Sequence, residues 1–255
     1  MRRSLALAFA LVALSAPDLA RADLVDVVPR VKQAVVAIGT WQRTRSPSFQ
    51  FRGTGFAVGD GRHIVTNAHV LPESLSGENL EALVMVQPGS DAEHIVRPLT
   101  RLEVDAAHDL ALLRFEAGMP LPALPLGEAA REGQHVAFTG FPLGGVLGIV
   151  PATHRGLIAA ITPIAMPQRS AAQLDPAQIR SLQRGAFHVY QLDATAYPGN
   201  SGGPLFDADT GKVLGIINMV FVKTTKENIL SQPSGISYAI PVEYVRRLLE
   251  KNGDE

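Results

Sequence analysis

The order of one serine and the histidines along the chain limits most strongly which folds this sequence can adopt. Ser201 lies in the glycine-rich run Pro198-Gly199-Asn200-Ser201-Gly202-Gly203-Pro204, which has strand-like apolar segments on both sides. The run fits G-x-S-x-G, the nucleophile elbow of α/β-hydrolases, whose base histidine comes after the serine in the sequence. All seven histidines of this chain precede Ser201. The α/β-hydrolase fold is therefore excluded, and a histidine that serves this serine must lie upstream.

Short apolar segments separated by turn residues make up most of the chain, which contains 23 Gly and 18 Pro. Segments 53–58 and 63–66, joined by Gly59-Asp60-Gly61-Arg62, are typical of a β-hairpin. Residues 95–103 are expected to form one strand, and the apolar segment 110–115 a buried one. Many short strands and few helices predict an all-β protein built as a sandwich or barrel.

The proline-rich stretch 120–127 predicts a boundary between two units, residues 23–120 and residues 121–255. A short amphipathic helix is expected at 23–33, with Pro29 limiting it. Residues 241–251 predict a closing helix, whose cationic side chains near its end suit the helix dipole. Between them, residues 162–186 form a long polar insert in which Asp175 and Pro176 would open a short helix.

Residues 1–22 have the features of a secretory signal peptide. Two arginines follow Met1, residues 5–14 form an apolar run too short to span a bilayer, and Ala20-Arg21-Ala22 offers small residues for cleavage. Cleavage before Asp23 would give a periplasmic or secreted protein with no stable membrane insertion. An uncleaved membrane anchor is the alternative.

Composition restricts the chemistry and the partners. The chain has no cysteine, so thiol catalysis and a cysteine-based zinc site are excluded. It also lacks HExxH, and its histidines show no tight ligand spacing, so neither a metal nor an organic cofactor is expected. A formal net charge of −1 without long runs of like charge argues against nucleic acid as a partner.

A serine nucleophile needs an imidazole that takes its proton and a carboxylate that orients the imidazole. His69 falls just beyond the strand 63–66, and Asp109 stands at the mouth of the apolar segment 110–115. Both positions suit displayed functional side chains, and a carboxylate beside an apolar strand needs partners. His63 is the rival base and Asp105 the rival orienting acid. The preferred order is therefore His69, Asp109, Ser201.

Three blocks carry a resemblance to a known family: Val65-Thr66-Asn67-Ala68-His69-Val70, His108-Asp109-Leu110-Ala111-Leu112-Leu113 and the glycine-rich run around Ser201. They resemble the catalytic blocks of chymotrypsin-fold serine proteases, and more narrowly the bacterial trypsin-like proteases of the HtrA/DegP type. The resemblance covers roughly residues 30–250. It implies two six-stranded antiparallel β-barrels with a short C-terminal helix, His69 and Asp109 on the first barrel, and Ser201 on the second.

The resemblance also implies a function and further site residues. It implies a serine endopeptidase that cuts unfolded or misfolded proteins through an acyl-enzyme, with an oxyanion hole formed by Gly199 and Ser201 around Asn200. The side-chain pocket would be lined by Thr195, Ile216, Ile217 and Asn218; without a carboxylate at its floor, cleavage after small or medium aliphatic residues is expected.

Three further expectations concern assembly and alternatives. HtrA proteins usually carry PDZ domains after the protease domain; little sequence follows the closing helix here, so a protease domain alone is expected. The resemblance implies a homotrimer built by N-terminal segments. A chaperone-like or binding module with a resting-inactive protease site, and an esterase acting on small acyl groups, remain open as alternatives.

Overall fold

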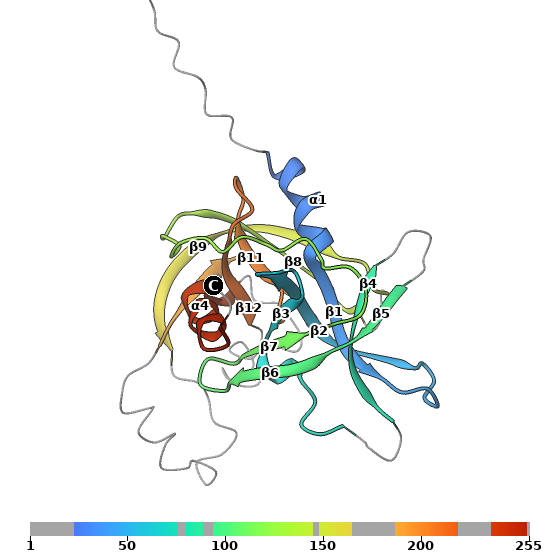
Figure 1. Cartoon of the computed structure of the whole chain (residues 1–255). Coiled ribbons are helices and arrows are strands. Elements are labelled where there is room, and N and C mark those ends of the chain that lie inside the picture. Colours follow the sequence, from blue (N-terminus) through green and yellow to red (C-terminus); the bar gives the residue numbers. More distant parts are fainter. Residues whose placement is uncertain are drawn as a thin grey trace, which may run out of the picture.

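The chain forms two antiparallel β-units that lie side by side, the first drawn in blue to green and the second in yellow to red (Figure 1). The computed structural model describes residues 23–75, 80–88, 94–144, 148–164, 187–218 and 236–253. The expected signal peptide at 1–22 and the expected helix at 175–178 lie outside these ranges, as does the insert beyond residue 164. The remaining elements confirm the all-β prediction.

The first unit is a seven-stranded sheet with the strand order β5-β4-β1-β2-β3-β7-β6. Its strands are β1 (Val35–Trp41), β2 (Phe49–Val58), β3 (His63–Thr66), β4 (Ala82–Pro88), β5 (His94–Pro98), β6 (Thr100–Asp105) and β7 (Leu110–Arg114). Helix α1 (Leu24–Ala34) precedes β1, and the one-turn 3-10 helix η1 (Ala68–Val70) follows β3.

The seventh strand arises because the single strand expected at 95–103 is broken. Pro98 ends β5, and the buried Leu99 turns the chain, with its N–H donating to Leu83 O at 2.9 Å. On one side of this break β5 pairs with β4, and on the other β6 pairs with β7. The two edges of the sheet are therefore consecutive in the chain. The first barrel is completed by the bend at Leu99, rather than by a hydrogen-bonded ladder between edge strands.

The second unit is a closed six-stranded barrel, as predicted, with the order β10-β13-β12-β11-β8-β9. Its strands are β8 (His135–Gly140), β9 (Ala152–Ile164), β10 (Phe187–Asp193), β11 (Pro204–Asp207), β12 (Val213–Asn218) and β13 (Ile236–Pro241). Helix α4 (Val242–Glu250) follows and confirms the closing helix. It is fastened to the segment between the units, because the Arg246 guanidinium donates to the carbonyls of Leu126 and Gly127.

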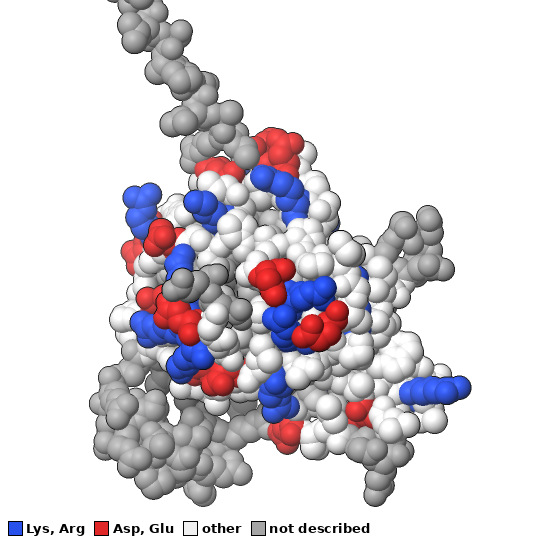
Figure 2. All heavy atoms as spheres, viewed as in Figure 1, with Lys and Arg blue, Asp and Glu red and all other residues white. Residues whose placement is uncertain are grey.

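One apolar core runs through both units. Its buried members come from α1, from the first sheet, from strands of the second barrel and from α4, and a smaller, separate cluster lies within the second unit. Within the part of the chain that is described, no helix is long and apolar enough to cross a membrane. Acidic and basic side chains are interspersed over the face shown in Figure 2.

Candidate active site

The side chains of His69 and Asp109 meet at the ends of two neighbouring strands. β3 ends at Thr66, and the single turn of η1 places His69 just beyond this end of the strand. Pro72 prevents a longer helix. Asp109 immediately precedes β7, the partner of β3 in the sheet. His69 Nδ1 lies 2.5 Å from Asp109 Oδ2. The pairing expected from the sequence is therefore present, with the imidazole oriented by the carboxylate.

Asp109 is held by several donors besides His69. Its φ of +54° lies in the left-handed region, where Asp is one of the few tolerated residues other than Gly. The backbone N–H of His69 donates to Oδ1 at 2.8 Å, and Asn218 Nδ2 donates to Oδ2 at 2.7 Å. Asn67 Nδ2 and the Ala68 N–H donate to the Asp109 carbonyl at 3.0 and 3.1 Å. These bonds fix a buried carboxylate that would otherwise be costly to desolvate.

The rival residues are paired elsewhere. His63 is buried between Asp60, 2.9 Å from its Nδ1, and Arg114, 2.9 Å from its Nε2. Asp105 contacts His108, with 2.6 Å between Asp105 Oδ2 and His108 Nδ1. Burial alone raises the pKa of Asp105, but its hydrogen bond and ionic attraction with His108 outweigh that effect and lower the pKa. Each rival thus takes part in a separate pair.

The segment before Ser201 forms a type II turn. The Asn200 N–H donates to Tyr197 O at 3.0 Å, Pro198 occupies the second position, and Gly199 has a φ of +101° at the third. A type II turn demands a positive φ there, which explains the glycine. The Asn200 N–H is used in the turn and cannot donate to an oxyanion. Within the expected oxyanion hole, Asn200 therefore only separates Gly199 from Ser201. Its buried side-chain amide has no hydrogen-bond partner among the residues described.

Ser201 is brought to the first sheet by contacts on both of its sides. Its carbonyl accepts from the Thr54 N–H at 2.8 Å, and the Thr54 hydroxyl donates to Gly199 O at 2.7 Å. A Cβ on Gly202 would collide with Thr54 O and would lie 3.2 Å from Asn67 N. The turn therefore packs against the residues that lead into η1. Ser201 itself is nearly buried, with 5% of its surface exposed.

The residues expected to line the side-chain pocket occupy different environments. Thr195 is half-buried in the segment before the turn, where Ser237 Oγ binds both Ala194 O and the Ala196 N–H at 2.8 Å. Ile216 and Ile217 are fully buried on β12, in the shared core and in the barrel core respectively. The Asn218 side chain bonds to Asp109. Their assignment to a substrate pocket stays a prediction.

Three residues of this site were missed or given another role in the sequence analysis. Thr54 and Asn67 were quoted only as parts of motifs, and Asn218 was expected to contact substrate. Each forms a hydrogen bond with a residue at least 42 positions away in the chain, and a local sequence pattern does not predict such a contact. The signal that was available is chemical: a polar residue within an apolar strand, as Asn218 is in β12, requires a buried partner.

Among the residues described, no three His, Cys, Asp or Glu side chains gather as they would around a metal ion. The site consists instead of a serine, an imidazole, a carboxylate and backbone donors. That combination is suited to acyl transfer.

Comparisons with known proteins show the family to which the chain is similar. Residues 53–216 match the family model described as a trypsin-like peptidase domain. The chain is 30% identical to human (Homo sapiens) serine protease HTRA4, over 88% of this chain and 40% of that protein. It is 32% identical to mitochondrial serine protease HTRA2 of Bos taurus, over 89% of this chain and 43% of the relative. It is 30% identical to serine protease HTRA1B of Danio rerio, over 91% of this chain and 41% of that protein. The chain thus spans about two fifths of the length of these relatives.

Proposed function

The chain belongs to the trypsin-like peptidase family, and from that premise we propose that it is a serine endopeptidase of the HtrA type that acts through Ser201, His69 and Asp109. The observation that carries the proposal is the hydrogen bond of 2.5 Å between His69 and the buried Asp109 carboxylate. With Nδ1–H donated to Asp109, the second ring nitrogen, Nε2, is left as the base.

The proposed reaction has two halves. Ser201 Oγ attacks the carbonyl carbon of the substrate while His69 Nε2 takes the hydroxyl proton, and Asp109 stabilises the resulting imidazolium. His69 then gives this proton to the departing amine as the peptide bond breaks, which leaves an acyl-enzyme. A water molecule, deprotonated by His69, attacks the acyl carbon and releases the acid, and the proton returns to Ser201.

The turn supports an oxyanion hole formed by the N–H groups of Gly199 and Ser201. The Pro198 carbonyl accepts from the Leu143 N–H at 2.8 Å, and in a trans peptide the following N–H, that of Gly199, points the opposite way. The Gly199 N–H has no hydrogen-bond partner in the described ranges, so it can serve a developing oxyanion. One such donor contributes roughly 10²–10³ in rate.

The proposed substrates are unfolded or misfolded proteins, cut after small or medium aliphatic residues. Resemblance to the HtrA type supports the first point. The neutral character of Thr195 and of the isoleucines of β12 supports the second, because a site for Arg or Lys would place a carboxylate at the pocket floor. Efficient cleavage confined to Arg or Lys peptides would refute this specificity.

A fluorophosphonate probe tests the nucleophile directly. We expect it to label the wild-type protein, and to label neither Ser201→Ala nor His69→Ala, with casein hydrolysis lost in both variants. Wild-type protein that stays unlabelled and inactive, with or without a peptide activator, would contradict the proposal. Comparing casein with short-chain esters separates an endopeptidase from an esterase.

One observation favours a second candidate, a chaperone-like binding module whose protease site rests inactive. Among the described residues the buried side-chain amide of Asn200 has no hydrogen-bond partner, and each such group costs about 1–3 kcal/mol. That cost favours a rearrangement of the turn which carries the oxyanion donors. If Ser201→Ala suppresses aggregation of an unfolded client and keeps its cellular role unchanged, binding is the function.

A further inference from the structure

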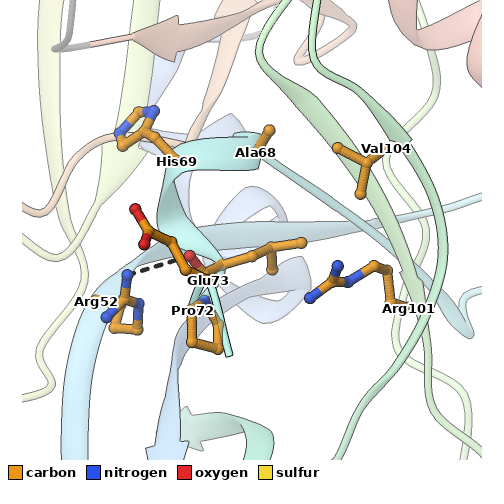
Figure 3. Close-up of a pocket in the computed structure, with 8 residues that line it drawn as sticks. Arg52, Ala68, His69, Pro72, Glu73, Arg101 and Val104 are labelled. Atoms are coloured by element: carbon orange, nitrogen blue, oxygen red, sulfur yellow. Dashed lines mark hydrogen bonds between the residues drawn. The ribbon is translucent and has the colours of Figure 1, made fainter. Parts of the chain in front are cut away.

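A cavity of about 240 Å³ adjoins His69 on the side of the first sheet. β2, η1 with the residues after it, and β6 supply its walls: Arg52, Ala68, His69, Leu71, Pro72, Glu73, Arg101 and Val104 (Figure 3). Small-molecule sites usually measure about 300–1,000 Å³, so this cavity suits a single side chain of a larger ligand. None of the expected pocket residues of the second barrel lines it.

Two guanidinium groups reach this cavity from opposite walls, and they differ in how they are held. Arg52 is fixed by backbone carbonyls at the end of η1, with Nε donating to Val70 O at 2.6 Å and Nη2 donating to Leu71 O at 3.1 Å. In Figure 3 the Glu73 carboxylate points toward Arg52 and away from Arg101. The charge of Arg52 thus has an acidic neighbour.

Arg101 is the uncompensated cation of the cavity. Its guanidinium has no hydrogen bond or ion pair with any part of the chain that is described, and its side chain is exposed on β6. The remaining walls are apolar apart from His69, whose Nδ1 is already used by Asp109. The cavity therefore offers a carboxylate a charged, forked donor and offers a cation nothing comparable.

We propose that this cavity is a subsite for an acidic side chain, Asp or Glu, of the protein substrate. The inference rests on the proposed function, since the cavity shares His69 with the reacting atoms. An extended peptide advances only about 3.3 Å per residue, so a side chain that enters a cavity walled by His69 belongs to a residue within one or two positions of the cut. The subsite adds a second requirement to the aliphatic residue expected before the cut.

Matched peptides that differ only by Glu or Gln test the subsite. Each pair carries the acidic residue at one position on either side of the cut, and kcat/KM is measured for both members. We expect the wild-type protein to favour Glu by about tenfold at one position, as a charge-assisted hydrogen bond allows. Arg101→Gln should reduce the Glu-to-Gln ratio to near one, and Arg101→Glu should invert it. Glu73→Gln should raise it, because it removes the one carboxylate among the lining residues of the cavity.

Arg131→Gln is the matched control, because it removes an equal charge from an exposed arginine of the second unit, outside the cavity. Its Glu-to-Gln ratio should equal that of the wild type. Binding of the same peptides to Ser201→Ala, followed by fluorescence anisotropy, gives the ratio without catalysis. A ratio of one in wild type, or a ratio unmoved by Arg101→Gln, would overturn the subsite. Loss of all cleavage with the binding ratio intact would instead refute only the proposed function.

Discussion

At the residue scale, the left-handed conformation of Asp109 requires the hydrogen-bond donors that surround this residue. A left-handed φ at a residue other than glycine costs of order 1–3 kcal/mol and persists only where the surroundings enforce it. Here the surroundings are the donors from Asn67, Ala68 and His69 in the first unit and from Asn218 in the second. The orientation of the Asp109 carboxylate is therefore determined by both units together.

Asn218→Ala should lower kcat roughly 10- to 100-fold with little change in KM, because a hydrogen bond to a charged group contributes about 1.5–3 kcal/mol. Steady-state kinetics on an aliphatic peptide measures the effect. Asn252→Ala is the control, since the Asn252 amide donates to a backbone carbonyl, Leu248 O, at the far end of α4. Equal kcat in the Asn218 variant and the wild type would show that the bond does not orient the acid.

His154 predicts a dependence of stability on pH. It lies on β9, stacked on Phe138 at 5.0 Å, with its Nε2 buried and unpartnered among the residues described. Burial lowers the pKa of His154 from its usual 6.5, so the folded state favours the neutral ring. The unfolded chain then binds the proton more readily, and stability that is complete above pH 6.5 is lost as the pH falls toward the folded pKa.

The free energy of unfolding in urea, measured at pH 8 and pH 5.5, checks this sign. His154→Phe keeps an aromatic ring on Phe138 and removes the titration, so it should lose less stability on acidification than the wild type. His135→Gln, which changes an exposed histidine of β8, should behave as the wild type does. An identical loss in the wild type and the Phe variant would disprove the assignment to His154.

At the scale of elements, the type II turn before Ser201 carries the proposed oxyanion donor. Gly199→Ala would place a methyl group against Phe141 O and force an L-residue to a φ of +101°. The turn should then rearrange and remove a donor, which would lower kcat by about 10²–10³ while the barrel stays folded. Turnover and thermal unfolding of the same preparation separate the two effects.

Gly133→Ala is the matched control for that turn. Gly133 also has a positive φ, +80°, but nothing lies within 4 Å of the position its Cβ would take. It shares the backbone strain without the collision, so it should lose some stability and no activity. Comparable loss of kcat in both variants would mean that general destabilisation, and not the oxyanion donor, explains the effect of Gly199→Ala.

Elements with a local signal were predicted well, and those that depend on distant contacts were not. The hairpin formed by β2 and β3, the strand β7 and the helix α4 follow from apolar periodicity and turn residues in their own sequence. The break at Leu99 does not, because it depends on pairing with β4 on one side and β7 on the other. The helix expected at 23–33 is confirmed as α1 (Leu24–Ala34), but Pro29 lies inside it and does not limit it. The buried face of α1, which includes Val27 and Val31, compensates for the lost hydrogen bond.

The candidate site divides in the same way. The order of His69, Asp109 and Ser201 could be predicted because each stands beside a recognisable strand end or turn. Their supporting contacts could not, since Asn218 reaches Asp109 across 109 residues and Thr54 reaches Gly199 across 145. Contacts at such separations depend on how the two β-units pack. A short stretch of sequence carries no information about this packing.

At the scale of the whole molecule, the two units meet at the site through Thr54. This fully buried residue of β2 makes three bonds to the second unit: its N–H to Ser201 O, its hydroxyl to Gly199 O, and its Oγ1 from the Phe141 N–H at 3.2 Å. The same contacts thus join the units and position the turn before Ser201. Stability and catalysis should therefore be linked at this residue.

Thr54→Val keeps the shape of the side chain but leaves Gly199 O and the Phe141 N–H without their partner. We expect a loss of about 1–3 kcal/mol in the free energy of unfolding together with a larger loss of kcat, because the oxyanion turn is displaced. Thr54→Ser, which keeps the hydroxyl, should restore most of the activity. Thr139→Val removes a buried hydroxyl that bonds to Thr153 at 2.8 Å within the second barrel, and should reduce stability while sparing kcat. Parallel losses of stability and activity in the Thr54 and Thr139 variants would mean that Thr54 holds the units together without positioning the turn.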